Sequence, residues 1–234
     1  MRIGTVLGEA WELYKRFLWQ FVATAAIVFA ILDLLSAVAD NSANGNAGAI
    51  LFWSILAFVI GVVGYFWVQA ALVELVRDVR DGRADRTVGE TYSAVQPRLP
   101  AVIVAGILAG IGIGIGFVIF IIPGLVLLTI WSMIVPAIVI EGRSASESFG
   151  RSRAIVRGNG FRVFGLIVVT FLLVAIASTI IRVILSPLPE FLNAWLGALV
   201  AHSLTVPFVV AAITTAYFHL TAGETATATS PALD

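Results

Sequence analysis

Three ionisable residues lie inside long apolar stretches of the sequence, where their side chains could do chemistry. They are Asp33, Arg182 and His202. Charged groups are costly inside a membrane, so they commonly mark ion, proton or ligand pathways. Asp33 and Arg182 fall toward corresponding ends of their stretches, where they could pair with each other or reach the interface. His202 has no acidic neighbour in the sequence, so it is either a proton-relay or ligand group or a histidine hydrogen-bonded inside a helix bundle.

A second group of candidates is basic and accompanies a short pattern of a small residue, Glu, a small residue and an aromatic residue. The three copies are residues 8–11 (GEAW), 89–92 (GETY) and 146–149 (SESF). Around each glutamate, apolar residues recur with the spacing of one helix face. Arg16, Arg86 and Arg151 follow or precede the three copies. Because basic side chains at a membrane surface attract anionic headgroups, we expect these arginines to contact lipid phosphates.

Two of the three copies also carry a helix-start signal. Thr87 and Ser144 each stand three residues before the glutamate, which is the spacing of a capping box. In the first copy Thr5 stands four residues before Glu9, so the start of that helix is less defined. Each copy therefore predicts an amphipathic helix. Its apolar face can lie on the bilayer or dock on the bundle, and the sequence leaves both arrangements open.

Glycine and proline indicate where helices pack or bend. Gly106, Gly110 and Gly114 have the spacing that lets two membrane helices approach closely, so we expect them to pack against a neighbouring helix; a hinge or a ligand groove is the alternative. Pro136 and Pro207 lie inside apolar stretches and predict curvature or a kink that opens a cavity. With no cysteine, paired acids or nucleophile–base pair in view, we predict no enzyme activity, no catalytic residue, no cofactor and no bound metal.

The elements that position these residues follow from composition. The 234 residues are 60% hydrophobic and 12% charged, whereas a soluble domain carries roughly 25% charged residues, so lipid must be the solvent for most of this chain. Six apolar stretches can each cross ~30 Å of hydrocarbon at ~1.5 Å per residue. They are residues 17–39, 49–75, 101–122, 124–140, 161–185 and 190–219. The third and fourth meet at Pro123-Gly124, which predicts a tight turn there.

The basic residues predict the orientation. Apart from Arg182, the 14 Lys and Arg residues lie at the N-terminus or in and beside the second and fourth connections. Arg-rich short connections stay in the cytoplasm, so both termini are expected there. The fold predicted is all-α: a membrane domain over 1–220 with six transmembrane helices, built as three parallel repeats of an interfacial helix and a transmembrane hairpin. The repeats cover about 1–76, 77–141 and 142–220, and the polar segment 221–234 is expected to be disordered.

Several strings together resemble a known family. They are DGR (81–83) with TVGE (87–90), IPG (122–124), WSMIVPAIVIEG (131–142), SFGRSRAIVRGNGFRVF (148–164) and PFVVAAITTAY (207–217). They resemble the membrane-domain family associated with glycerophosphoryl diester phosphodiesterases and related uncharacterised bacterial six-span proteins. The resemblance covers nearly the whole chain and implies a multi-pass protein of the bacterial inner (plasma) membrane. The family's named activity belongs to a separate soluble domain, so the resemblance implies no catalytic residue here.

Two functions remain open on these grounds. The first is a non-enzymatic membrane protein that organises lipids or partner proteins through its interfacial helices. The second is a transporter or channel for a small or lipid-like solute, with Pro136, Pro207 and His202 around a cavity. The expected partners are membrane lipids, with a protein partner or a second copy of the chain also open. Nucleic acid is not expected, because the net charge is +0 and the arginines adjoin membrane ends.

Overall fold

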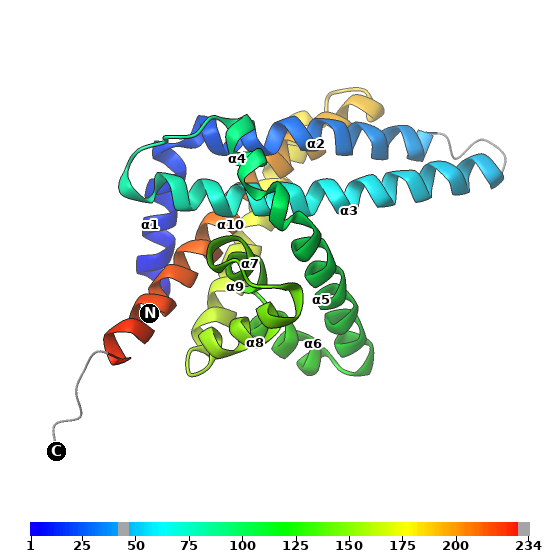
Figure 1. Ribbon diagram of the computed structural model, residues 1–234. Helices are drawn as coiled ribbons and strands as arrows, with labels where there is room; N and C mark the ends of the chain where they lie inside the picture. Colours follow the sequence, from blue (N-terminus) through cyan, green and yellow to red (C-terminus); the bar gives the residue numbers. More distant parts are fainter. Residues whose placement is uncertain (42–46, 229–234) are drawn as a thin grey trace, which may run out of the picture.

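The computed structural model of the protein describes residues 1–41 and 47–228, and their regular structure is entirely helical. The elements in chain order are α1 (Ile3–Arg16), α2 (Leu18–Asn41), α3 (Ala47–Asp78), η2 (Val79–Asp81), α4 (Val88–Val95), η3 (Gln96–Arg98), α5 (Leu99–Ile119), α6 (Ile121–Ile130), α7 (Ile134–Glu141), α8 (Ala145–Val156), α9 (Gly160–Leu185) and α10 (Glu190–Ala228). Figure 1 shows α10 passing through the centre of this arrangement.

Six segments of the described chain are long and apolar enough to cross a membrane, as predicted. They are Leu18–Ser36, Ile50–Asp81, Val88–Ile119, Ile121–Glu141, Gly160–Leu185 and Glu190–Gly223. Their outer surfaces carry large apolar side chains; Val118 and Ile122, for example, are 87% and 74% exposed. Such a surface suits lipid rather than water, because soluble monomers rarely expose broad apolar patches. The chain is therefore a multi-pass membrane protein by the length and composition of its helices.

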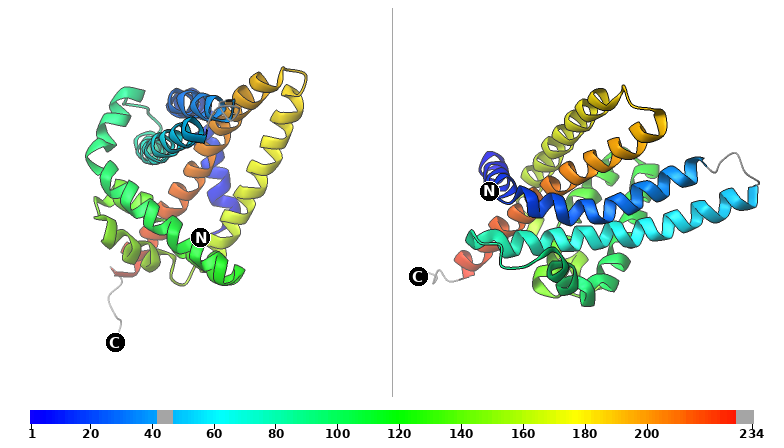
Figure 2. Two further views of the ribbon diagram at one scale, coloured as in Figure 1. Left: turned by 90° about the vertical axis from the view of Figure 1, so that its right-hand side faces the viewer. Right: turned by 90° about the horizontal axis from the view of Figure 1, so that it is seen from above.

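The long helices form three hairpins whose tips diverge. In Figure 1 the hairpin α2–α3 extends to the right, while α5 descends to meet α6. Figure 2, seen from above, shows α9 and α10 leading to a tip well apart from that of α2–α3. The helices meet where α10 packs on α1, α2, α3 and α9. There the C-terminal half of α3 is enclosed, because residues 70–76 are all buried.

The turn between α5 and α6 is displaced from its predicted place. Phe120 has an extended backbone (φ −160°, ψ 153°) and alone separates the two helices. Pro123 and Gly124 lie in the first turn of α6, where the missing N–H of a proline has no helical partner to lose. Gly124 is not among the described glycines with positive φ, so the tight turn predicted at Pro123-Gly124 lies at Phe120 instead.

The fourth span is interrupted rather than merely bent. α6 ends at Ile130 and α7 begins at Ile134, so the break precedes Pro136. A proline ring clashes with the carbonyl four residues earlier, which here belongs to Ser132 inside the break. α10, by contrast, continues through Pro207.

The C-terminal segment also differs from its prediction. α10 continues to Ala228, so the part of 221–234 that the structure describes is helical rather than disordered. Residues 229–234 lie outside the described chain. Once a helix is packed, adding further residues to its end costs little free energy. The polar composition of 221–234 alone does not indicate that this segment continues such a helix.

Candidate functional site

The short helices α4 and α8 begin where the sequence predicts. Thr87 Oγ1 accepts from the Glu90 N–H at 3.3 Å, and the Glu90 carboxylate accepts from the Thr87 N–H at 2.8 Å. Ser144 and Glu147 make the same reciprocal pair. Hydrogen bonds from the backbone N–H and side chain of Ser144 lower the pKa of the Glu147 carboxyl. Both predicted capping boxes are confirmed, and they fix the direction in which each helix leaves its connection.

The helices α1, α4 and α8 each pack an aromatic ring edge-to-face against a ring of a spanning segment elsewhere in the chain. The pairs are Trp11–Phe208 with ring centroids 5.9 Å apart, Tyr92–Trp67 at 5.5 Å and Phe149–Trp131 at 5.1 Å. The ring planes meet at 82°, 89° and 87°, the favourable edge-to-face geometry. Of the two arrangements left open by the sequence, these contacts correspond to docking on the bundle.

Each of the three helices also donates a hydrogen bond from one side-chain hydroxyl to a backbone carbonyl of another helix. The bonds are Tyr14 to Leu204 O at 3.0 Å, Tyr92 to Thr24 O at 2.6 Å and Ser152 to Ile130 O at 2.7 Å. Burial raises the pKa of the Tyr14 hydroxyl to about 12, so it keeps its proton and remains a donor at neutral pH. These bonds fix the depth and rotation of the short helices.

We expect Tyr92→Phe to lower the free energy of unfolding by about 1 kcal/mol, the usual net value of one internal hydrogen bond. The hydroxyl is lost while the ring still packs on Trp67. Thermal melting in detergent measures the change. Tyr65→Phe is the matched control, because Tyr65 is 41% exposed and its hydroxyl accepts only from Gln69 within its own helix. Equal shifts in the two variants would contradict a docking role for the Tyr92 hydroxyl.

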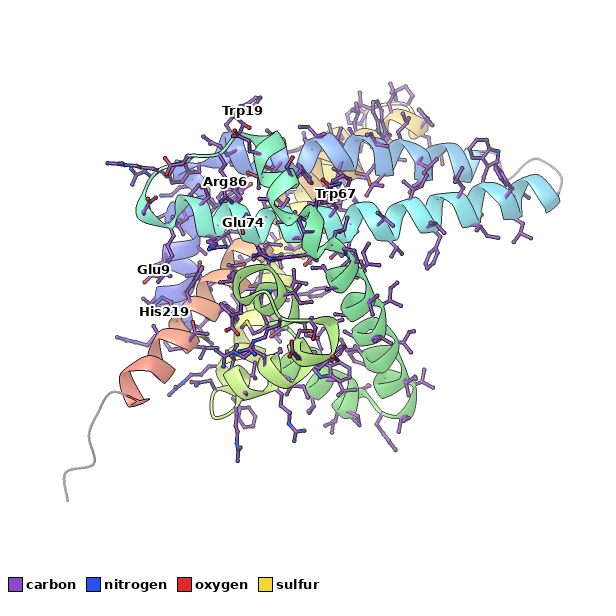
Figure 3. The ribbon with its side chains drawn as sticks, in the orientation of Figure 1. Glu9, Trp19, Trp67, Glu74, Arg86 and His219 are labelled. Carbon is purple, nitrogen blue, oxygen red and sulfur yellow. The ribbon has the colours of Figure 1, made fainter. Side chains whose placement is uncertain are left out.

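The three arginines expected to meet lipid phosphates all contact protein groups. Arg16 donates to Gly82 O at 2.9 Å, and Arg151 Nε donates to the Glu141 carboxylate at 2.8 Å. Arg86 pairs with Glu74, whose side chain is only 3% exposed; Figure 3 shows the two together beside α3. These arginines therefore connect segments of the chain, and their contact with lipid stays a prediction.

Glu141 is the centre of a charged cluster that joins α7, α8 and α10. Its carboxylate accepts from Arg151, from Arg143 Nε at 3.1 Å and from the Tyr217 hydroxyl. Glu74 and Glu141 were not among the predicted site residues. The sequence pattern that could have identified these two residues is an acid at the end of an apolar stretch with arginines soon after it in the chain.

Asp33 pairs with His202 and not with Arg182. His202 Nδ1 lies 3.0 Å from Asp33 Oδ1, and the imidazole also stacks on Phe29 with centroids 5.1 Å apart. The Asp33 side chain is 10% exposed and the His202 side chain 47%, so the contact between α2 and α10 is buried on the Asp33 side and open on the His202 side. Arg182 is exposed, and it has no ion pair within the described part of the chain. The acidic partner of His202 was missed because it lies 169 residues away in sequence.

The close helix contacts of α5 use a different glycine set from the predicted one. A Cβ at Gly106 would overlap the Phe66 ring, as expected, but at Gly110 or Gly114 it would meet nothing within 4 Å. Gly112 and Gly116 make the other close approaches. A Cβ there would lie 2.6 Å from the Trp131 ring and 3.0 Å from the Gly124 backbone, respectively. Gly110 and Gly114 therefore do not pack on a helix of this chain.

Three hollows accompany these contacts. An apolar groove of about 760 Å³ runs between α1, α9 and α10, with Leu7, Trp11, Leu173, Ala177, Leu204 and Phe208 in its lining. A polar pocket of about 850 Å³ lies on another side of α1, between α1, α10 and the end of α3. A cavity of about 260 Å³ contains Pro136, Gln69 and Thr214. His202 lies outside that cavity, so the structure does not bring the predicted transport residues Pro136 and His202 together.

The comparisons with known proteins identify a family and no individual relative. Within the described residues no group of three or more His, Cys, Asp or Glu side chains could hold a metal ion. No curated protein and no solved structure matches the chain. A family described as a domain of unknown function (DUF7847) matches residues 1–229, without a link to glycerophosphoryl diester phosphodiesterases. The chain belongs to this DUF7847 family.

Proposed function

We propose that the protein is a non-enzymatic integral membrane protein that binds and organises membrane lipid. The observation that carries this proposal is the apolar groove between α1, α9 and α10. Two of its walls are spanning helices, so the groove opens within the depth of the bilayer. An acyl chain is the apolar occupant available at that depth, and the groove volume is within the common range for a ligand site, ~300 to 1,000 Å³.

The position of Lys15 in the groove lining supports a lipid whose phosphate lies toward α1. Lys15 is the charged member of the lining and lies directly before the start of the first span. Its ammonium pairs with Glu12 at 2.8 Å while remaining 47% exposed, which leaves it able to contact a phosphate. Trp19, nearby on α2, is 77% exposed and suits the headgroup level where tryptophan is enriched (Figure 3).

Filling the groove tests this function. We expect Ala177→Trp to lose most of the lipid that stays bound after gentle extraction, because an indole side chain would occupy the space of the acyl chain. Native mass spectrometry measures the bound lipid. Ala175→Trp is the matched control, since Ala175 is exposed on the same helix and outside the groove lining. Lipid retention by Ala177→Trp equal to that of the wild type would remove the groove as a lipid site.

The proposal also covers the orientation of the chain in the membrane and its internal repeat. We infer that both termini face the cytoplasm of a bacterial cell and that three units of short helix plus hairpin follow one another. Arginine placement supports the orientation, and the three matched ring contacts and hydroxyl bonds support the repeat. The motif order supports kinship with the membrane domains associated with glycerophosphoryl diester phosphodiesterases. A protein partner or a second copy of the chain on the exposed hairpins also belongs to this proposal.

Reporter fusions test the orientation. We expect reporters at Gly82, at Gly158 and at the C-terminus to read as cytoplasmic, because arginine-rich connections are retained on that side. Reporters at Asn44 and after Leu188 should read as external. An external reading at Gly82 would overturn the six-span topology.

A second candidate function is transport of a small or lipid-like solute. The contact of Asp33 with His202 within spanning helices favours it, because ionisable groups there commonly serve ion or proton pathways. The cavity beside Pro136 is lined mainly by apolar side chains, with Gln69, Ser132 and Thr214 as polar members, and its volume of about 260 Å³ holds only a small solute. A liposome assay that compares the flux of protons or solute through Asp33→Asn with that through the wild type tests this function. An unchanged flux would show that the contact of Asp33 with His202 is not part of a transport pathway.

A further inference from the structure

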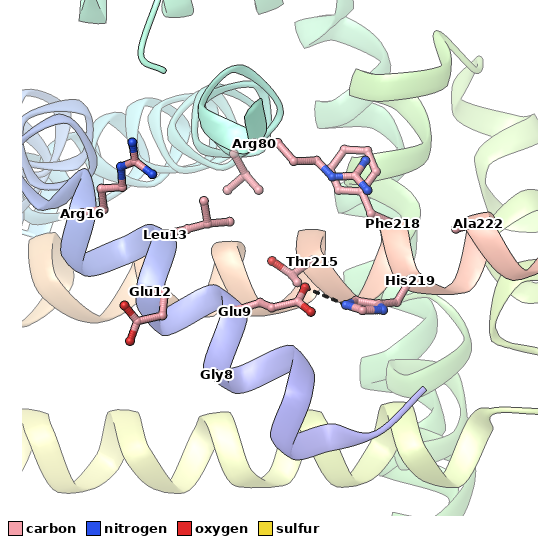
Figure 4. Close-up of a pocket in the computed structure, with 11 residues that line it drawn as sticks. Gly8, Glu9, Glu12, Leu13, Arg16, Arg80, Thr215, Phe218, His219 and Ala222 are labelled. Atoms are coloured by element: carbon pink, nitrogen blue, oxygen red, sulfur yellow. Dashed lines mark hydrogen bonds and ion pairs between the residues drawn. The ribbon is translucent and has the colours of Figure 1, made fainter. Parts of the chain in front are cut away.

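The polar pocket beside α1 combines both signs of charge. Figure 4 shows Arg16 and Arg80 on opposite sides of the pocket, with Glu9 and Glu12 on α1. Two carboxylates and two guanidinium groups therefore line one hollow of about 850 Å³, and their formal charges cancel. A purely anionic or purely cationic ligand would meet repulsion from half of these groups. The arrangement matches a ligand that itself carries one group of each sign.

Within the described part of the chain, the guanidinium groups of Arg16 and Arg80 retain unused donors. Arg16 spends one of its five N–H groups on Gly82 O. Arg80 lies over the Phe218 ring, 4.0 Å from its centroid, which holds the guanidinium by a cation–π contact and leaves its edges available. A planar guanidinium with free N–H groups is well suited to a phosphate, which it can bind through two parallel hydrogen bonds.

The carboxylates of Glu9 and Glu12 can accept hydrogen bonds from a ligand cation. Glu9 accepts from His219 Nε2 at 2.7 Å through one oxygen, and Glu12 pairs with Lys15. Both remain exposed, at 50% and 73% of their side chains. Carboxylates of this kind accept hydrogen bonds from a primary ammonium and form no such bond with a fully methylated one.

The rest of the lining is largely apolar. Thr215 lines the pocket and is 5% exposed, and its Oγ1, which is buried, has no hydrogen-bond partner among the described residues. Leu13, Val76 and Phe218 supply an apolar side to the same hollow.

We propose that this pocket binds a phosphoethanolamine group, with the phosphate on Arg80 and the primary ammonium on Glu9. The pocket stands at a membrane surface, because Arg16 directly precedes the first span and Arg80 closes the second. The headgroup of an ethanolamine phospholipid is therefore one source of the group, and a free phosphoethanolamine is the other. The inference rests on the proposed lipid binding for its ligand class but uses a site separate from the apolar groove.

Lipid competition tests the assignment with the full chain in nanodiscs. Native mass spectrometry should find phosphatidylethanolamine retained over phosphatidylglycerol and phosphatidylcholine by about tenfold, the effect of one hydrogen bond to a charged group. Glu9→Gln should abolish the preference, because it removes the acceptor of the ammonium. Arg80→Gln should lower the retention of all three lipids, because each carries the phosphate. Arg83→Gln, an exposed arginine of the same connection outside the pocket, should keep it.

Each result decides a separate point. A preference for phosphatidylglycerol, or none at all, would overturn the assignment, as would loss of preference in Arg83→Gln. Displacement of the retained lipid by soluble O-phosphoethanolamine would support the pocket chemistry and identify the free compound as a source; lack of displacement would identify the lipid headgroup. Ala177→Trp should reduce total lipid without changing headgroup preference, so failure of the groove and failure of this pocket are distinguishable.

Discussion

Arg86→Gln should lower the free energy of unfolding by about 2 to 3 kcal/mol, because it leaves the carboxylate of Glu74 buried without its closest partner. Arg86 is 41% exposed and Arg77 remains 3.5 Å from Glu74, so we expect less than the loss of a fully buried pair. For a chain of this size the change corresponds to roughly 5 to 10 °C in melting temperature. Thermal melting followed by tryptophan fluorescence in detergent measures it.

Two further variants identify the cause of that loss. Arg83→Gln removes the same charge from an exposed position of the same connection and should leave the melting temperature nearly unchanged. The double variant Glu74→Gln/Arg86→Gln should recover much of the stability, because neither partner then keeps an unpaired charge. If the effect of Arg86→Gln depended on anionic lipid and the double variant recovered nothing, the arginine would act on lipid and not on Glu74.

Gly116→Val should separate α5 from α6 and lower the free energy of unfolding by about 3 kcal/mol. The atoms that a new Cβ would meet at 3.0 Å are Cα and N of Gly124, which belong to the backbone and cannot rotate away. In lipid, close backbone approach is a main source of helix association, so lost contact is not offset by apolar burial. Melting in detergent measures the change.

The same helix supplies the controls for this change. Gly110→Val and Gly114→Val add an identical side chain where nothing lies within 4 Å, so each should shift the melting temperature little. Their small effect would come from helix propensity, which slightly favours valine over glycine. Three equal losses would mean that the glycine content of α5, and not its contact with α6, sets the stability.

Local patterns predicted the local parts of this fold. The spans followed from apolar length, and the capping boxes followed from Thr87 and Ser144 standing three residues before a glutamate. Both signals lie within a few turns of helix, so no knowledge of the packing was needed. The break before Pro136 could also have been predicted from local chemistry, because the proline ring clashes with the carbonyl of Ser132 in a continuous helix.

Contacts between distant segments were not available from those patterns. Asp33 and His202 are 169 residues apart, and Tyr217 and Glu141 are 76 apart, so their pairing depends on how α10 crosses the other helices. Spacing showed that Gly106, Gly110 and Gly114 share a face but not which part of that face is covered. Arginine placement likewise indicated a membrane boundary without showing that Arg86 has a buried acid as its partner.

The break between α6 and α7 has a consequence for the order of biosynthesis. The Met133 N–H donates to Ser152 Oγ at 3.1 Å, and that hydroxyl donates to Ile130 O; the partners are 19 and 22 residues apart in sequence. Backbone groups without partners are costly in hydrocarbon. Ser152 follows the fourth span in the chain, so this span cannot reach its final form before α8 has been synthesised. Membrane insertion of the second hairpin therefore finishes only when α8 has been translated and docked.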